Sequence, residues 1–422
     1  MSQKKINQLF NFEKGVLQSS KCIEGEYDFI TAAAEWKTHN EYSHDCEALI
    51  FASAASGSLG RTHYVNGKFI SSDLCFILTP KDPETLPVDL KFYHIIFNLY
   101  KNEIVAATKA GTSKEAIGLK VFGEYELPYF DITLQSKVKA EFGKAEELKN
   151  SLFDEYTYQL TQLENLNQAI LQEAVQGKLV KQVPKEDPAS ELLKRIKAEK
   201  AKSGKKEKPL PPIKPEEIPF EIPENWVWCR LGGICEINGG YAFKSTDYTK
   251  DGIRVIRISD FDKNGFINNS IVRHNYNEKL KSFLLDKENI LLAMTGGTVG
   301  KSYFVENLPE PLVVNQRVAT IKILGDLIIP KFIDVVVKSS ITQRIIHERK
   351  NSTNDNISMD DIKSFLIPLP PLSEQKRIVT EIDKQFAKTK QLKEHIIANQ
   401  KATEQLLKAL LHQAFEVKVV KK

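Results

Sequence analysis

The sequence repeats itself at a spacing of 240 residues, and no other feature constrains the fold as strongly. FASAASGSLGRTHYV at 51–65 and LLAMTGGTVGKSYFV at 291–305 share a turn of small, glycine, basic and hydroxyl residues after an apolar run. FISSDLCFIL and LVVNQRVATI align only after a further slip of about three residues, because connections tolerate insertions. The same spacing relates Thr112 to Ser352, Ser113 to Thr353, Ile117 to Ile357, Leu127 to Ile367, Pro128 to Pro368, Gln135 to Gln375, Glu141 to Glu381, and residues 171–180 to 411–420. A register kept over this length predicts a tandem duplication.

Each repeat ends in a segment with the pattern of a long helix. Apolar residues recur there at intervals of three, four and seven without a proline, which is typical of a coiled-coil seam. About forty residues at ~1.5 Å each give a rod of roughly 60 Å. Ser373 is the expected N-cap of the second rod. The seams comprise Val138, Phe142, Ala145, Leu152, Tyr156, Leu163, Leu166, Ile170 and Ala174, and Ile378, Ile382, Phe386, Leu392, Ile396, Thr403, Leu406, Leu410 and Ala414.

We therefore expect an α+β fold in which a strand-rich module followed by a long helix occurs twice, with the two helices packed together. Asp187 and Pro188 are expected to start a short linker helix that ends near Lys200. The lysine-rich stretch that follows reads as a solvated tether more readily than as a nucleic-acid arm. The expected boundaries are 1–135 for the first module, 136–182 for its helix, 183–218 for the linker, 219–372 for the second module and 373–418 for its helix.

The segment ending Gly300-Lys301-Ser302 resembles the start of a phosphate-binding loop, but it fails that pattern. Thr295 stands where a glycine is required, and the residues that follow favour a strand rather than the necessary helix. The turn still brings backbone N–H groups beside a cation, which suits phosphate contact without hydrolysis. A tight turn whose glycines serve only the backbone is an equally good interpretation.

The composition excludes several classes of protein. Of 422 residues, 41% are hydrophobic and 27% charged, and the net charge is only +4, which permits nucleic-acid binding without arguing for it. The N-terminal stretch has no apolar signal region, and no run approaches the ~18 apolar residues of a membrane span. Five scattered cysteines without CxxC pairs suit a reducing cytoplasm and small buried side chains. The histidines show no metal-ligand spacing, so no metal site is expected.

IPENWVWCRLGGI, GGYAFKSTDY, the strand–GGTVGK loop, VVNQR and IPLPPLSEQKRIVTEIDKQF occur in this order, with DPASELLKRIKAEK in the linker. In order and spacing these motifs resemble the specificity subunits of Type I restriction–modification systems, and the resemblance covers nearly the whole chain. The first repeat departs from the pattern, because ITLQSKVKAEF replaces the SEQ-containing motif and the ENWVW opening is missing. For one of Trp226 and Trp228, core packing is a simpler interpretation than base stacking.

The resemblance implies a DNA-recognition subunit for host defence and DNA methylation that catalyses nothing itself. Each module would read one half of a bipartite, asymmetric site in double-stranded DNA. The helices would pack as an antiparallel coiled coil, set the spacer and dock two methyltransferase subunits, with restriction–translocase subunits added for cleavage. S-adenosylmethionine, ATP and Mg²⁺ would belong to those partners, so no cofactor is expected on this chain. Half-sites about one DNA turn apart, ~34–36 Å, lie within reach of the rod.

Arginine pairs with guanine edges, and asparagine or glutamine with adenine edges. Asn315, Gln316 and Arg317 are therefore candidates for reading bases. Replacing Lys301 or Arg61 is expected to weaken binding uniformly and to flatten its salt dependence, as phosphate contacts do. The full set of candidate DNA-binding residues is Ser58, Arg61, Lys109, Lys244, Arg254, Arg257, Thr298, Lys301, Asn315, Gln316 and Arg317.

Two other interpretations stay open on the sequence alone. The chain is also compatible with a non-catalytic coiled-coil adaptor whose modules bind protein rather than DNA. An enzyme with an unrecognised site, such as a nuclease, is the third interpretation, and metal-dependent cleavage by the isolated chain would reveal it.

Overall fold

A computed structural model describes residues 2–54, 57–111, 115–202, 208–323, 325–349 and 356–420, without the side chains of 408 and 411–420. The chain divides into two units, Met1–Thr157 with Ile397–Lys422, and Tyr158–Ile396. The boundaries of these units fall inside the two long helices and not at the expected module ends. The repeat pairs Thr112–Ser352 and Ser113–Thr353, and the side chain of Ala414, lie outside the described residues.

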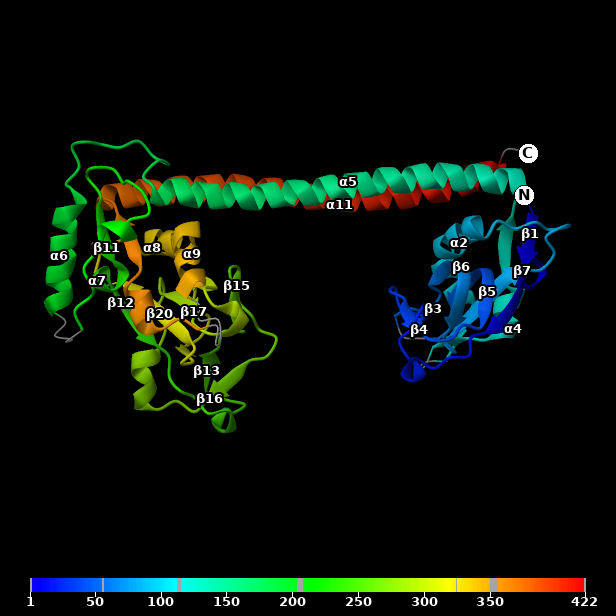
Figure 1. Ribbon diagram of the computed structural model, residues 1–422, viewed down its shortest axis with the longest axis horizontal. Coiled ribbons are helices and arrows are strands. Elements are labelled where there is room, and N and C mark those ends of the chain that lie inside the picture. The colour runs from blue at the N-terminus through cyan, green and yellow to red at the C-terminus, as the bar shows by residue number, and fades with distance from the viewer. Residues whose placement is uncertain are drawn as a thin grey trace. The chain divides into compact units, whose positions relative to one another are not determined.

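The first module is built on a six-stranded sheet of order β2-β7-β5-β6-β3-β4, in which only the β3–β6 pairing is parallel (Figure 1). Phenylalanines from the sheet and from α2 fill its core, including Phe10, Phe51 and Phe97. Its elements are β1 Ser2–Lys5, α1 Ile6–Leu9, β2 Phe10–Lys14, β3 Tyr27–Ile30, β4 Lys37–His39, β5 His44–Ala52, β6 Thr62–Ser71, β7 Cys75–Pro80, α2 Leu90–Leu99, α3 Lys101–Thr108, β8 Lys109–Ala110, β9 Ala116–Ile117, α4 Leu119–Glu124 and β10 Glu126–Tyr129.

The second module combines a four-stranded sheet, β12-β20-β17-β18, with a three-stranded sheet, β16-β13-β19. Strands β13 and β19 pair in parallel, as β3 and β6 do in the first module. Its elements are α6 Ala189–Lys202, β11 Val227–Arg230, α7 Leu231–Ile234, β12 Cys235–Gly239, β13 Ile253–Ile256, β14 Phe261–Asp262, β15 Gly265–Phe266, β16 Val272–His274, β17 Ile290–Ala293, β18 Ser302–Phe304, β19 Leu312–Val314, β20 Val318–Ile323, α8 Pro330–Lys338, α9 Ser340–Arg349, α10 Met359–Lys363 and β21 Leu366–Leu369.

The first module has an opening strand although the ENWVW motif is missing from its sequence. Strand β1 pairs antiparallel with β10, and β11 pairs antiparallel with β21, so that Lys4 opposite Leu127 corresponds to Cys229 opposite Ile367. A short helix and a further strand follow in both modules. The sequence SQKK does not predict a strand, because it has no alternation of apolar and polar residues. This strand forms through backbone pairing with β10.

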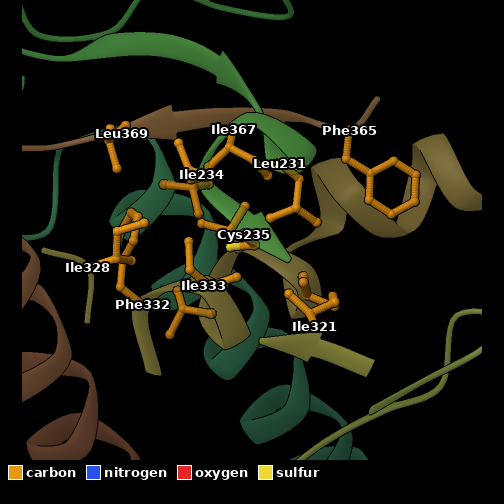
Figure 2. Packing of buried hydrophobic residues seen from close by; sticks show 14 of the residues in the cluster. Leu231, Ile234, Cys235, Ile321, Ile328, Phe332, Ile333, Phe365, Ile367 and Leu369 are labelled. Carbon is orange, nitrogen blue, oxygen red and sulfur yellow. The ribbon is translucent and has the colours of Figure 1, made fainter. Parts of the chain in front are cut away.

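The core of the second module gathers side chains from segments far apart in the sequence. Figure 2 shows Leu231, Cys235, Phe332 and Ile367 converging there with other aliphatic residues. Trp226 is also buried, which confirms core packing as its role. The linker helix α6 contributes Ala189, Leu192 and Ile196 to the same core. This part of the linker is therefore an integral layer of the module, since an apolar stripe lies among its charges, and not a solvated spacer.

The long helices are α5, Ile132–Val175, and α11, Leu372–Val420. Helix α5 begins four residues before its expected start and ends before 182, and α11 already includes Ser373, so that residue is not its N-cap. In the second unit the Thr389 hydroxyl donates to Asn167 Oδ1 at 2.8 Å, and Gln182, beyond the end of α5, donates to Glu374 near the start of α11 at 2.6 Å. The two helices run antiparallel there.

Part of the expected seam is wrong. Leu166, Leu392, Leu406 and Leu410 are about half exposed, at 47%, 51%, 60% and 51%. Thr389 of the second unit, which was not in the expected seam, is buried between the helices. In the first unit the hydroxyls of Tyr156 and Thr403, both members of the expected seam, are 3.0 Å apart. The spacing of apolar residues therefore does not identify the packed face of a helix where hydroxyl and amide side chains form hydrogen bonds between the helices.

These elements confirm the expected α+β fold with a duplicated strand-rich module and long helices. None of the helices in the described part of the chain is long and apolar enough to cross a membrane.

Candidate DNA-recognition surface

Several connections of the second module meet at one end of its four-stranded sheet. Gly239 pairs with Ala319, Ala293 with Val318, and Leu292 with Ser302, so the last residues of β12 and β17 lie beside the first residues of β18 and β20. We call three segments the loop end of the second module: residues 240–244, which follow β12, residues 294–301, which join β17 to β18, and residues 315–317, which join β19 to β20. The loop end contains five of the predicted residues, Lys244, Thr298, Asn315, Gln316 and Arg317, and the backbone of a sixth, Lys301.

Backbone hydrogen bonds hold these connections to one another. Gln316 N donates to Tyr241 O at 2.9 Å, and Met294 N donates to Arg317 O at 3.0 Å. Asn315 N donates to Ile256 O at 2.9 Å, which ties the turn to the end of β13. The loop end is thus a fixed frame rather than a set of independent loops, because each connection satisfies a backbone group of another.

Some side chains of the loop end form hydrogen bonds with its own backbone, and others are exposed to solvent. Asn315 Oδ1 accepts from Arg317 N at 3.1 Å, so this amide stabilises its own turn. Gln316, Arg317 and Lys244 are exposed. Thr298 is half-buried, and its hydroxyl donates to Thr295 O at 3.4 Å. Gln316 and Arg317 are therefore the residues of this turn whose side chains are free to meet an external ligand.

Lys301 and Arg61 play the same structural part in the two modules. Lys301 Nζ donates to the carbonyl of Ile258, two residues after β13, and lies 4.9 Å from the centre of the Phe261 ring. Arg61 Nη1 donates to the carbonyl of Ala32, two residues after β3, at 2.8 Å, and to Ser58 Oγ at 3.3 Å. Burial lowers the pKa of Lys301, against the opposing pull of nearby aspartates. Both cations brace their own loops, which makes them weaker candidates for phosphate contact than their sequence suggests.

The turns that carry these cations also match in their backbone. Gly60 N donates to Ala52 O at 2.8 Å and Arg61 N to Ser58 O at 3.0 Å. The corresponding bonds in the second module, Gly300 N to Ala293 O and Lys301 N to Thr298 O, are both 3.0 Å. Gly60 and Gly300 have φ of 78° and 87°, a left-handed conformation that favours glycine. The turn joins two strands directly, so the exclusion of a phosphate-binding loop is consistent with the structure.

Arg254 does not reach the loop end, and its expected role in DNA contact has to be revised. It is 3% exposed, and its guanidinium donates to Asn268 Oδ1 at 2.9 Å and to Ile267 O at 2.8 Å. Arg257 is half-buried and forms a two-pronged pair with Asp260 at 2.7 and 2.8 Å, which raises its pKa. Both arginines hold the segments that follow β13: Arg254 from a position on the strand, which sets the side to which its side chain points, and Arg257 from the residue after the strand ends.

Lys109, in the first module, lies on the β8–β9 hairpin and pairs with Glu115 at 2.8 Å, with each side chain a little under half exposed. The hairpin adjoins the glycine turn, since Ile117 N donates to Ser53 O at 2.8 Å. In the second module Ile357 N donates to Met294 O at 2.9 Å in the same way.

Among the described residues, no three histidine, cysteine or acidic side chains are grouped as metal ligands would be. Three of the five cysteines are buried, as expected of small core side chains.

Residues 223–400 match the family described as the Type I restriction modification DNA specificity domain. The specificity subunit of the Type I restriction enzyme EcoAI from Escherichia coli is 38% identical over 250 residues, covering 57% of this chain and 42% of that protein. The EcoEI specificity subunit from Escherichia coli is 31% identical over 266 residues, covering 59% of this chain and 44% of that protein. The matched region spans less than half of the length of these two relatives.

A chain from a solved structure on complex assembly and conformational transition of the type I R-M system shares the fold with a TM-score of 0.56. It is 17% identical, and the match covers 98% of this chain and 97% of that chain. This likeness concerns the fold alone. The resemblance drawn from the sequence motifs is confirmed by the family match and the named relatives, and residues 223–400 belong to the Type I restriction modification DNA specificity domain family.

Proposed function

We propose that this chain is the DNA-recognition subunit of a Type I restriction–modification complex. Each module reads one half of a bipartite, asymmetric site, and the helices set the spacer between the halves. The observation that carries the proposal is the exposed pair Gln316 and Arg317 on the braced loop end. A rigid frame that displays an amide and a guanidinium suits recognition of adenine and guanine edges in the major groove.

Backbone contacts to DNA come from a different set of residues. Lys244 is exposed at the rim of the loop end and supplies a mobile positive charge for phosphate. The paired glycine turns supply backbone N–H groups beside Thr298 and Ser58. Lys301 and Arg61 shape these turns through the carbonyls that they bind. In this proposal affinity and base selection rest on separate side chains, so they respond separately to mutation.

The helices supply the docking surfaces for partner subunits in this proposal. Leucines off the seam, such as Leu392, Leu406 and Leu410, are about half exposed and leave apolar surface on α11. Two methyltransferase subunits dock on such helical surface and methylate an adenine in each half-site, and restriction–translocase subunits join for cleavage. S-adenosylmethionine, ATP and Mg²⁺ belong to those partners. This chain binds and orients DNA and performs no chemical step.

The experiment is a DNA-binding titration of the full chain co-purified with the methyltransferase subunit of its own system. Binding to genomic duplex fragments is measured at several salt concentrations. The proposal predicts that the logarithm of the affinity falls linearly with the logarithm of salt, and that a subset of fragments binds much more tightly. An assembled complex that binds no DNA at any salt concentration would favour the protein-binding adaptor. Metal-dependent cleavage by the isolated chain would identify a nuclease.

A further inference from the structure

One turn of the first module carries no arginine, asparagine or glutamine, the residue types that pair with guanine and adenine edges. Residues Ser72, Asp73 and Leu74 connect β6 to β7. Ser72 N donates to Ile30 O at the end of β3 at 2.9 Å, and Cys75 N donates to Ser72 O at 2.9 Å. Leu74 N donates to Ser72 Oγ at 3.3 Å. The serine hydroxyl thus caps the turn from inside.

The turn from Asn315 to Arg317 has the same hydrogen bonds. Asn315 N donates to Ile256 O at the end of β13 at 2.9 Å, and Val318 N donates to Asn315 O at 2.9 Å. Arg317 N donates to Asn315 Oδ1 at 3.1 Å, in the place of the serine hydroxyl. Asn315 therefore corresponds to Ser72, and Gln316 and Arg317 correspond to Asp73 and Leu74.

Neighbouring segments confirm this correspondence independently. Ser53 N donates to Leu74 O at 2.9 Å, as Met294 N does to Arg317 O at 3.0 Å. Asp73 N donates to Leu17 O at 3.1 Å, as Gln316 N does to Tyr241 O at 2.9 Å. Glycine precedes both acceptor segments: a Cβ would lie 2.1 Å from Ser72 O at Gly15 and 2.2 Å from Asn315 O at Gly240. Two segments on either side of each turn therefore hold it in the same frame.

The two turns share a backbone frame but carry different side chains: an acid and a leucine in the first module, an amide and a guanidinium in the second. Leu74 is 39% exposed although it is apolar, and Asp73 is half-buried with an acidic group. Neither side chain suits phosphate, which repels an acid and gains nothing from a leucine. Both suit base edges, because a carboxylate accepts from the cytosine amino group and an apolar side chain contacts the thymine methyl group. The Ser72 hydroxyl accepts from Leu74 N and donates to Asp73 Oδ1, each at 3.3 Å, so one carboxylate oxygen of Asp73 supports the turn and the other is left for a base edge.

We infer that Asp73 and Leu74 are the specificity-determining residues of the first module, at the positions that Gln316 and Arg317 hold in the second. This inference rests on the proposed function and deepens it. The backbone frame is common to both halves, and the two displayed side chains set which half-site is read. The two half-sites then differ because an acid and a leucine replace an amide and a guanidinium.

The test compares the parent with Asp73→Asn and with the double variant Asp73→Gln/Leu74→Arg, each as a full chain in complex with its methyltransferase subunit. Glu84→Gln is the matched control, because Glu84 is exposed, carries the same charge and follows the far end of β7. Methylated adenines are mapped at base resolution. Duplex competition then measures the discrimination of single base changes in each half-site.

The inference predicts that the double variant changes the base preference of one half-site and leaves the other unchanged. Asp73→Asn is expected to alter discrimination by roughly 10-fold in that half alone, the size of a lost base contact. The control should keep the motif of the parent. An unchanged motif for both Asp73 variants, where the parent gives a bipartite motif, overturns this inference alone. A parent complex without any bipartite motif overturns the proposed function as well.

Discussion

Gln135 and Gln375 hold the same buried junction in the two repeats. Gln375 Oε1 accepts from Ile329 N at 2.9 Å, and its amide donates to Pro370 O at 3.0 Å. Gln135 Oε1 accepts from Asp89 N at 2.7 Å, and its amide donates to Phe130 O at 2.8 Å. Both side chains are fully buried. One glutamine per repeat thus fixes the first turn of a long helix to its module.

Replacing Gln375 by leucine should lower the free energy of unfolding of the second unit by about 2 kcal/mol or more. The leucine fills similar volume but leaves the Ile329 N–H and the Pro370 carbonyl without partners, and each buried unsatisfied group costs ~1–3 kcal/mol. Chemical denaturation followed by circular dichroism measures the change. The same substitution at Gln391, which is exposed on the same helix, is the control and should be nearly neutral. Equal effects at both sites would refute the role of the junction.

Glu374 should make the second unit less stable as the pH rises. Burial raises the pKa of this carboxyl above its usual value of 4.5, against the hydrogen bonds from Trp226 and Gln182 and the nearby charge of Arg377. The folded state therefore holds its proton more tightly than the unfolded state does. This contribution is fully present below pH 4.5 and is lost as the pH rises through the raised value.

The measurement is the midpoint of thermal unfolding from pH 4 to 8 for the parent and for Glu374→Gln. The glutamine is always neutral and its carbonyl still accepts from the Trp226 N–H, so the variant should lose less stability over this interval than the parent. Glu394→Gln, at an exposed position of the same helix, should follow the parent. Parallel curves for parent and Glu374→Gln would contradict the assignment.

Arg254 and Arg317 should respond in opposite ways to the same substitution. Arg254→Met leaves Asn268 and the Ile267 carbonyl without a donor inside the module, so stability should fall by about 2 kcal/mol. Arg317→Met removes an exposed side chain, so stability should change by less than ~0.5 kcal/mol while base preference in one half-site changes. Thermal unfolding and duplex competition separate the two effects. A change of base preference for Arg254→Met with unchanged stability would reverse the assignment.

Lys244 and Lys301 offer a parallel contrast for phosphate binding. Lys244→Ala should weaken binding to all duplexes alike and reduce the slope of log affinity against log salt by about one, as loss of one phosphate contact does. Lys301→Met should lower stability instead, because the Ile258 carbonyl loses its donor. Titrations at four salt concentrations, with melting curves for each variant, measure both. If Lys301→Met leaves stability intact and changes the salt slope, then its side chain contacts phosphate directly.

The sequence predicted the duplicated architecture because glycines, buried glutamines and proline turns sit at fixed spacing in both repeats. Gln135 with Gln375 and Gly60 with Gly300 prove to be equivalent in space as well. The two long helices were also predicted, from apolar residues that recur at intervals of three, four and seven. The opening strand of the first module was not predicted, because its polar residues are held by backbone pairing alone.

Charge proved a poor guide to the candidate surface. Arg254, Arg257, Lys301 and Arg61 all bind groups within their own modules, and a sequence does not say whether a cation meets a carbonyl inside or a phosphate outside. Residue type did not point to Asp73 and Leu74 either, because neither is an arginine, asparagine or glutamine, the residues that pair with purine edges. The local slip of three residues in the repeat was the signal, because it aligns them with Gln316 and Arg317.

The most direct test of the account is the pattern of adenine methylation in a host that expresses this chain with its methyltransferase subunit. The account predicts one split motif, with two different half-sites and a methylated adenine in each half on opposite strands. A palindromic or uninterrupted motif from the assembled complex would contradict the claim that the two modules read different halves.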